Sequence, residues 1–267
     1  MRYRALVAVC SWFALIAPSL GGEPVLIAHR GLQRYAPENT MPALAACVEL
    51  SLGFELDVYS SRDDQLVVIH DGSLRRTTNG PDRSVREFTV AELKRFDAGS
   101  WFHPAFKGLT IPTLDEVLTM VSRAKRGTTS IALDIKQITP EGERQLVSLV
   151  AEHGLLSESF AFDQSNACSR RLKAQNQAFR IAQNVGRKDL NERLAADDLD
   201  VLLLTFVPTP AEMSLLHQKK KVALFNFAGP GTARCNPAIW DQVKAVGCDG
   251  MLTDFPLECR LHWREQQ

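Results

Sequence analysis

Short hydrophobic runs alternate with longer amphipathic segments along most of this chain. The runs are rich in β-branched and aliphatic residues, which is typical of buried strands, and the segments between them have the length and periodicity of helices. Nine runs predict strands, at residues 25–29, 53–59, 66–70, 131–136, 160–163, 179–183, 200–204, 222–225 and 250–253. A strand followed by a helix, repeated along the chain, predicts a parallel sheet covered by helices.

A parallel sheet built over about 250 residues closes most simply into a (β/α)8 barrel of the TIM type, in the α/β class. The alternative is an open, doubly wound sheet, but no glycine-rich phosphate turn follows the first predicted strand. Nine predicted strands exceed the eight places of the barrel by one. The surplus lies where only six residues, 60–65, separate two strands, too few for a crossover helix. Either a hairpin that turns at Asp63 and Asp64 or an irregular parallel crossover joins them, and both bring His70 close to Asp57.

Residues 72–112 connect the third predicted strand to the next helix and are too numerous for an ordinary loop of about 4 to 6 residues. We expect a small insertion that caps the barrel mouth and contains its own short helix at 90–96. Trp101, Phe102 and Phe106 are expected to pack this insertion rather than to bind a ligand. No linker rich in proline, glycine or serine divides the chain, so residues 23–267 are expected to form a single domain.

The first 22 residues have the pattern of a secretory signal peptide. Arg2 and Arg4 precede an apolar stretch at 5–17, and Ser19 and Gly21 are small residues that suit cleavage. The apolar stretch is shorter than the ~18 residues of a membrane span, and an uncleaved N-terminal anchor is the alternative. The sequence therefore predicts a secreted or periplasmic protein with no stable membrane span after signal cleavage.

The charge balance excludes one class of function. The chain has 31 basic and 31 acidic side chains, so loss of Arg2 and Arg4 with the signal leaves 29 against 31. A protein that binds nucleic acid carries a basic surface, which this balance does not provide. We therefore expect a small-molecule partner and no nucleic acid.

Six cysteines occur, and Cys10 lies within the signal. The remaining five are an odd number, so at least one is unpaired within the monomer. Cys47 is expected to pack in the core. A disulfide among Cys235, Cys248 and Cys259 stays open, because spacing alone cannot choose a pair. No spacing of cysteines and histidines indicates zinc.

Three acidic residues at strand positions indicate a metal site. Glu55 and Asp57 are two apart in a predicted strand, so both side chains leave the same face. Two like charges pressed together in a barrel interior repel each other unless a cation lies between them. Asp134, near the end of another predicted strand, completes an oxygen cage that suits one divalent cation, Mg²⁺ or Ca²⁺. The alternative is a set of ordinary ion pairs with Arg30 and Lys136.

His29 and His70 each end a predicted apolar strand, which is where barrel enzymes carry out their chemistry. Because imidazole titrates near neutral pH, one ring can take a proton from an attacking oxygen while the other gives one to a departing alcohol. Arg30 has a planar guanidinium that matches phosphate oxygens. Lys136 supplies either a second positive charge for phosphate or a counter-ion for the carboxylates.

The segment before the helix predicted at 41–52 belongs to the same region. Thr40 is expected to be the N-cap of this helix. Glu38 and Asn39 are expected to point toward the site.

Seven motifs follow one another along the chain in a characteristic order. They are His29-Arg30-Gly31, Pro37-Glu38-Asn39-Thr40, Glu55-Leu56-Asp57-Val58, His70-Asp71, Arg76-Thr77-Thr78-Asn79-Gly80, Ile111-Pro112-Thr113-Leu114 and Asp249-Gly250-Met251-Leu252-Thr253-Asp254-Phe255-Pro256. In order and spacing, the motifs resemble those of the glycerophosphodiester phosphodiesterase family, a group of PLC-like phosphodiesterases. The resemblance spans nearly the whole mature chain.

The resemblance implies a metal-dependent TIM barrel that hydrolyses deacylated phospholipids to glycerol 3-phosphate and an alcohol. The roles it implies are acid and base for His29 and His70, phosphate ligand for Arg30, and metal ligand for Glu55, Asp57 and Asp134. The family usually has Glu where this chain has Asp134. It also has a Trp-Thr-Val-Asn segment where this chain has Phe225 and Phe227, which are expected to keep an aromatic wall of the substrate site.

Two other functions are compatible with the same site residues. The first is a lipid phosphodiesterase on the same barrel, such as a lysophospholipase D or a sphingomyelinase D. Exposed apolar side chains at the mouth, near Phe102, Phe106 and Phe227, would favour it. The second is a protein that captures phosphodiesters without cleaving them. The two histidines argue against the second, because binding requires charge but does not require a paired acid and base.

Overall fold

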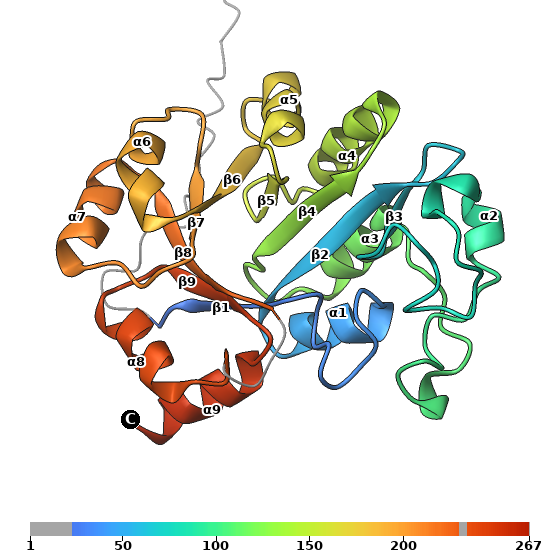
Figure 1. Ribbon diagram of the computed structural model, residues 1–267, viewed down its shortest axis with the longest axis horizontal. Coiled ribbons are helices and arrows are strands. Elements are labelled where there is room, and N and C mark those ends of the chain that lie inside the picture. The colour runs from blue at the N-terminus through green and yellow to red at the C-terminus, as the bar shows by residue number, and fades with distance from the viewer. Residues whose placement is uncertain (1–22, 230–233, 267) are drawn as a thin grey trace, which may run out of the picture.

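Eight parallel strands close into a barrel in the computed structural model, which describes residues 23–229 and 234–266 (Figure 1). Around the barrel the order is β1, β2, β4, β5, β6, β7, β8 and β9, and β9 pairs with β1 to close it. The barrel strands are β1 (Val25–Ala28), β2 (Gly53–Ser60), β4 (Ile131–Gln137), β5 (Ser159–Phe162), β6 (Arg180–Val185), β7 (Val201–Leu204), β8 (Val222–Phe227) and β9 (Gly250–Thr253). The predicted TIM-type barrel is confirmed. The expected signal peptide, at 1–22, lies outside the described residues.

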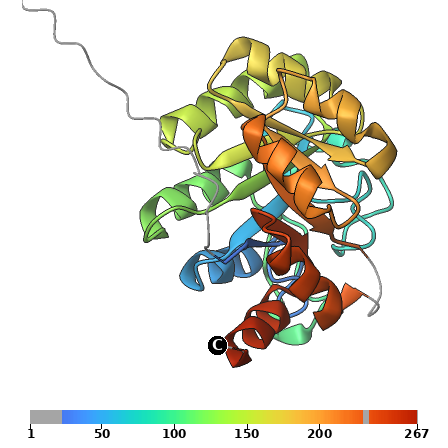
Figure 2. The ribbon, with the colours of Figure 1, turned by 90° about the vertical axis from the view of Figure 1, so that its left-hand side faces the viewer.

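Helices cover the outside of the barrel (Figure 2). They are α1 (Met41–Glu49), α3 (Leu114–Ala124), α4 (Pro140–Glu152), α5 (Ala167–Gln175), α6 (Leu190–Leu194), α7 (Pro210–Gln218), α8 (Pro237–Ala245) and α9 (Pro256–Glu265). Thr113 and Thr209 cap α3 and α7 by accepting from backbone N–H groups of the first turn. Thr40 occupies the N-cap position of α1, but its hydroxyl donates to the carbonyl of Pro37 instead of capping the helix. Within the described ranges, no helix is both long enough and apolar enough to span a membrane.

The surplus strand is β3 (Leu66–Val68), which pairs antiparallel with the end of β2 and is not one of the eight barrel strands. Val58 is opposite Val68 in this hairpin. The hairpin alternative is therefore confirmed, and the parallel crossover is wrong. The backbone N–H of Ile69 donates to the carbonyl of Asp57 at 3.0 Å, so His70 leaves the hairpin beside Asp57.

The insertion at 72–112 packs beside this hairpin (Figure 1). It contains two 3-10 turns, η1 (Val85–Glu87) and η2 (Pro104–Phe106), and a short helix, α2 (Val90–Leu93), where a helix at 90–96 was predicted. Its own small core, which includes Val85 and Leu93, packs on side chains of β3 and the residue after it. Phe102 lies edge-on to both Trp101 and Phe106, but these rings lie outside the small core and 39% of the surface of Trp101 is exposed.

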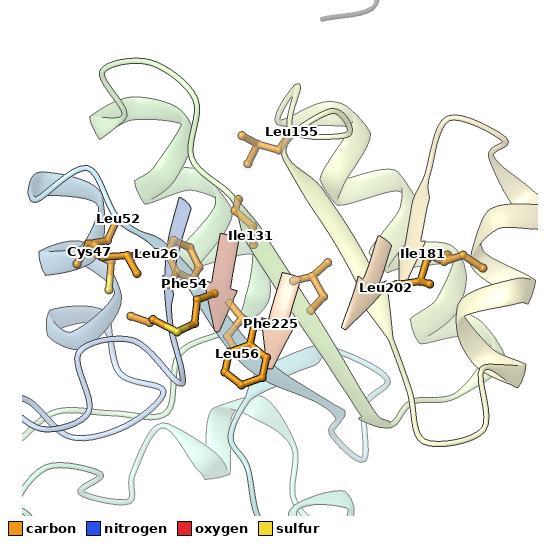
Figure 3. Packing of buried hydrophobic residues seen from close by; sticks show 14 of the residues in the cluster. Leu26, Cys47, Leu52, Phe54, Leu56, Ile131, Leu155, Ile181, Leu202 and Phe225 are labelled. Carbon is orange, nitrogen blue, oxygen red and sulfur yellow. The ribbon is translucent and has the colours of Figure 1, made fainter. Parts of the chain in front are cut away.

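Strand side chains alternate between two hydrophobic layers. One layer fills the barrel interior and consists of Ile27, Ala132, Phe160, Phe162, Ala182, Val201, Leu203, Leu224 and Leu252. The larger layer lies between the barrel and its helices and includes Phe54, Leu56 and Phe225 (Figure 3). Because Phe54 and Leu56 face outward, Glu55 between them faces the interior.

The five cysteines that the structure describes are free thiols. Cys47 is buried in the outer hydrophobic layer, as predicted. The disulfide that the sequence left open among Cys235, Cys248 and Cys259 is not formed.

Candidate active site

Three carboxylates meet at the mouth of the barrel. Glu55 and Asp57 project from β2 and Asp134 from β4, and Asp57 is in register with Asp134. One oxygen from each of the three lies within 4.8 Å of the other two. Glu55 and Asp57 are almost completely buried, with 1% and 0% of their surface exposed. The grouping that the sequence predicted is therefore present.

Electrostatic repulsion within this group is strong. Burial raises the pKa of Glu55 well above its ordinary value of 4.5, and the charges of Asp57 and Asp134 raise it further. Burial also raises the pKa of Asp134, although Lys136 opposes that change. Glu55 and Asp134 therefore resist ionisation beside the other carboxylates of the group, and a bound cation removes this penalty.

Lys136 and Arg30 neutralise part of the negative charge of the three carboxylates. Lys136 Nζ lies 2.7 Å from Asp134 Oδ2 and 3.0 Å from Asp57 Oδ1, and Arg30 Nε lies 3.6 Å from Asp57 Oδ2. Burial lowers the pKa of Lys136, but Asp57 and Asp134 outweigh it, so the net pKa is raised and the ammonium stays charged. The ion pairs expected as an alternative are thus present in the same place as the acidic group.

The donor set nevertheless fits a divalent cation. Asp57 Oδ1 is buried and has no hydrogen-bond donor among the described residues, because Lys136 Nζ approaches it outside hydrogen-bond geometry. A buried carboxylate oxygen without a donor, in a group made only of carboxylates, is what a hard cation such as Mg²⁺ or Ca²⁺ prefers as a ligand. Glu55, Asp57 and Asp134 are the residues that would hold it.

The loop after β1 fixes these carboxylates from one side. The backbone N–H of Arg30 donates to Glu55 Oε2 at 2.8 Å. The Asn39 side chain donates from Nδ2 to Asp57 Oδ2 at 2.7 Å and accepts from the backbone N–H of Asp57 at 3.2 Å. Arg30 and Asn39 both have positive φ angles, 54° and 56°. Strained backbone of this kind persists where the surroundings hold it, and here it aims two donors at the acidic group. Asn39 faces the site as expected.

His29 follows β1, and Asp254 from the far end of the chain fixes its ring. Nδ1 lies 2.6 Å from Asp254 Oδ1, and Gln33 Nε2 donates to the same oxygen at 2.7 Å. Because Nδ1 is held by a carboxylate, the other ring nitrogen is left for chemistry. That nitrogen, Nε2, lies 3.9 Å from Glu55 Oε2. Asp254 is part of the last sequence motif, but no role was predicted for it, because nothing in the sequence places it beside His29.

His70 follows β3 and is held in the same way, with Nδ1 2.6 Å from Asp71 Oδ1. Arg76 donates to both oxygens of Asp71 and lowers the pKa of that carboxyl to about 2. Arg76 also donates to both oxygens of Glu38, and Glu38 in turn accepts from Arg30 Nη1 at 3.0 Å. Burial raises the pKa of Glu38, but Arg76 and Arg30 outweigh it, so the net pKa is lowered. Glu38 faces the site as expected, whereas Asp71 and Arg76 had been assigned no role.

Phe225 and Phe227, the expected aromatic wall, line a separate cavity of about 490 Å³ together with Arg234. Phe225 is buried in the layer between the barrel and its helices, and Phe227 stacks on it with ring centroids 5.2 Å apart. Alternation along β8 turns Asn226 to the opposite face, where its Nδ2 donates to Asn184 Oδ1 at 2.7 Å. The role of the two rings as a substrate wall therefore stays a prediction, since most of each ring packs on the outer side of the strand.

A cavity of about 740 Å³ opens beside Asp134 and Lys136. Its walls come from the ends of β4, β5 and β6 and from the start of α5. Polar side chains such as Gln137, Gln164 and Asn184 line the cavity together with apolar ones such as Ile138 and Phe162. The cavity therefore offers both hydrogen-bonding groups and apolar surface to a ligand that reaches the acidic group.

Comparison with known proteins identifies the family of this chain. The sequence pattern of the "Glycerophosphoryl diester phosphodiesterase family" matches residues 29–231. The chain is 34% identical over 243 residues to YhdW of Bacillus subtilis, a candidate glycerophosphodiester phosphodiesterase, and the alignment covers 86% of this chain and 94% of that protein. It is 36% identical over 141 residues to another glycerophosphodiester phosphodiesterase of Bacillus subtilis, covering 49% of this chain and 47% of that enzyme.

Solved structures agree. A phosphodiesterase of Oleispira antarctica, in complex with the product sn-glycerol-3-phosphate, is 26% identical with a TM-score of 0.74, covering 91% of this chain and 97% of that one. A glycerophosphodiester phosphodiesterase of Agrobacterium tumefaciens has the same fold, with a TM-score of 0.73, 24% identity and coverage of 89% and 99%. This chain therefore belongs to the glycerophosphoryl diester phosphodiesterase family, as its motifs indicated.

Proposed function

We propose that this enzyme hydrolyses glycerophosphodiesters to glycerol 3-phosphate and an alcohol, with two histidines as acid and base and one divalent cation, Mg²⁺ or Ca²⁺. The observation that carries the proposal is a pair of imidazoles, each held at Nδ1 by a carboxylate, next to a group of three acidic side chains of which two are buried. Family membership and the relative bound to sn-glycerol-3-phosphate support the substrate class.

The histidines move the protons. With Asp254 at Nδ1 of His29 and Asp71 at Nδ1 of His70, Nε2 of each ring is left to exchange a proton with an oxygen of the diester. One ring takes the proton of the attacking hydroxyl, whether of water or of the substrate itself. The other ring gives a proton to the departing alcohol.

The cationic side chains bind the phosphate. Arg30 carries a planar guanidinium beside Asp57 and suits two phosphate oxygens. Lys136 adds a second positive charge at the same rim. A divalent cation held by the three carboxylates supplies, when bound, further stabilisation of negative charge on the phosphate oxygens.

The lining of the mouth favours a soluble diester over a lipid. The cavity beside Asp134 and Lys136 presents mainly polar side chains. Of the aromatic residues that would have favoured a lipid, Phe102 and Phe106 pack against each other and Phe227 stacks on Phe225. Apolar side chains such as Ile138 and Phe162 also line this cavity, so the preference for a soluble diester rests on the charged and amide groups beside the carboxylates.

The test compares substrates, metals and variants of the purified mature enzyme. We expect hydrolysis of glycerophosphocholine that is lost with chelator and returns with Mg²⁺ or Ca²⁺. His29→Ala should lower kcat by about 10²- to 10⁴-fold, because it removes a general acid or base. His153→Ala is the control, since this ring pairs with Asp115 on the surface. Turnover confined to lysophospholipids would select the lipid phosphodiesterase instead, and binding without turnover would select the capture protein.

We also propose that the enzyme acts outside the cytoplasm, on the basis of the signal pattern at 1–22. N-terminal sequencing of the protein recovered from its native compartment should begin near residue 23. Retention of the first residues in a membrane fraction would support the anchor instead.

A further inference from the structure

The motif at 76–80 belongs to the insertion, yet its first side chain reaches the active site. The segment is folded back on itself, because Thr78 Oγ1 donates to the carbonyl of Leu74 at 2.6 Å and accepts from the N–H of Gly80 at 2.9 Å. Asn79 and Asp97 exchange two hydrogen bonds that involve their backbones, at 3.0 and 2.8 Å. The polar residues of the motif thus build a fixed turn, and Arg76 projects from it.

The guanidinium of Arg76 lies between two carboxylates and binds both. It donates from Nε and Nη2 to Asp71 at 2.6 and 2.9 Å, and from Nη1 and Nη2 to Glu38 at 2.8 Å each. Asp71 holds the ring of His70, and Glu38 holds the side chain of Arg30. One side chain of the insertion therefore links the imidazole and the guanidinium that face the diester.

We propose that Arg76 is a positioning residue that orients His70 through Asp71 and Arg30 through Glu38, so that the insertion completes the active site. This inference rests on the proposed function. Arg76 need not touch the substrate to act. Its removal leaves Asp71 free to rotate away from His70 and leaves the buried carboxylate of Glu38 with one cation fewer.

The contact of Arg76 with Glu38 differs from an ordinary surface ion pair, whereas its contact with Asp71 is more exposed. The side chain of Glu38 is only 7% exposed, so its charge is poorly screened by water. The neighbouring Arg75 offers the contrast, because 77% of its side chain is exposed and it binds Asp82 at the surface. Surface pairs of that kind contribute little.

Kinetics test the proposal with Arg76→Ala, Arg76→Lys and the matched control Arg75→Ala. Loss of charge-assisted hydrogen bonds should lower kcat/KM by about 10- to 100-fold in Arg76→Ala. Added guanidinium should restore part of that loss, and Arg75→Ala should stay within about threefold of wild type. Arg76→Ala should also cost less in an Asp71→Asn background than in wild type, because the two residues act on the same ring. Equal loss in both backgrounds, or activity like that of Arg75→Ala, would overturn the proposal.

A second readout does not depend on turnover. Nitrogen NMR of the histidine rings should give His70 a fixed Nδ1–H tautomer in the wild-type enzyme. Arg76→Ala should change the ring signals of His70 and leave those of His29, which is held by Asp254, unchanged. If both rings or neither respond, Arg76 does not position His70. If the wild-type enzyme cleaves no glycerophosphodiester, the proposed function fails while this measurement still decides the role of Arg76.

Discussion

The acidic group destabilises the metal-free fold and is proposed to bind a metal ion. Glu55→Gln separates these two effects, because it removes one of three carboxylates at nearly constant volume. Glu55 is 1% exposed, and burial and two neighbouring carboxylates raise its pKa. Without a metal ion, ionised Glu55 destabilises the fold by ~1.4 kcal/mol for each unit by which its pKa is raised. A neutral amide avoids this penalty and still accepts from the N–H of Arg30. The metal-free variant should therefore be more stable than metal-free wild type at neutral pH.

The sign of the pH dependence follows from the same shift. A carboxyl group whose pKa is higher in the folded than in the unfolded state favours folding while it is protonated. Metal-free wild type should therefore lose stability as pH rises from the ordinary value of 4.5 toward the raised pKa of Glu55. Burial raises the pKa of Asp134 and adds in the same direction, whereas Glu55→Gln should flatten this part of the profile.

Metal binding should reverse the order of the two proteins. An ion at about 100 times its Kd stabilises the wild-type fold by ~2.7 kcal/mol. For a domain of this size, 1 kcal/mol shifts Tm by about 2 to 4 °C, so the wild-type Tm should rise by about 5 to 11 °C. Glu55→Gln should show most of this rise missing. Thermal unfolding in chelator and in millimolar Mg²⁺ or Ca²⁺ measures both effects.

Glu143→Gln is the control, because this buried glutamate is bound to Arg171 on α5 and lies outside the acidic group. It should keep the full metal response whatever its own stability. A wild-type Tm that neither Mg²⁺ nor Ca²⁺ changes would contradict a metal site at these carboxylates. An equal rise of Tm with metal ion in Glu55→Gln and in Glu143→Gln would contradict it as well.

Three further predictions concern other parts of the molecule. Asp254→Asn should lower kcat about tenfold or more by releasing the His29 ring while the metal-induced Tm shift stays, and an unchanged kcat measured under saturating substrate would contradict it. Gly31→Ala should lower the free energy of unfolding by about 1 to 3 kcal/mol, because Gly31 has φ of +77° and a Cβ would lie 2.8 Å from the backbone of Ala43. A denaturant midpoint equal to that of wild type would refute this. Added reductant should leave Tm unchanged since the described cysteines are free, whereas a fall would reveal a disulfide.

The pairing of Glu55 and Asp57 in the acidic group could be predicted from the sequence, because it follows from the local alternation of residues along a strand. Glu55 and Asp57 alternate with Phe54, Leu56 and Val58, so one face of β2 is apolar and the other is acidic whatever the rest of the fold does. The short connection before Leu66 likewise limited the route of the chain, and the hairpin is one of the two routes it allowed.

Register and distant pairing could not be predicted in this way. β8 is apolar at nearly every position, so its sequence did not reveal that Phe225 faces the helices and Asn226 the interior. Asp254 lies 225 residues from His29, and only the pairing of β1 with β9 brings them together. A residue whose partner is defined by closure of the barrel carries no local signal of its role.

The two histidines therefore depend on different parts of the fold. His29 is oriented by Asp254, which stands at the end of the strand that closes the barrel. His70 is oriented by Asp71, which is bound in turn by Arg76 from the insertion. Because the proposed mechanism uses both rings, a perturbation of either the last strand or the insertion should impair the same reaction. The paired acid and base that we propose thus couples the closure of the barrel to the placement of an otherwise peripheral segment.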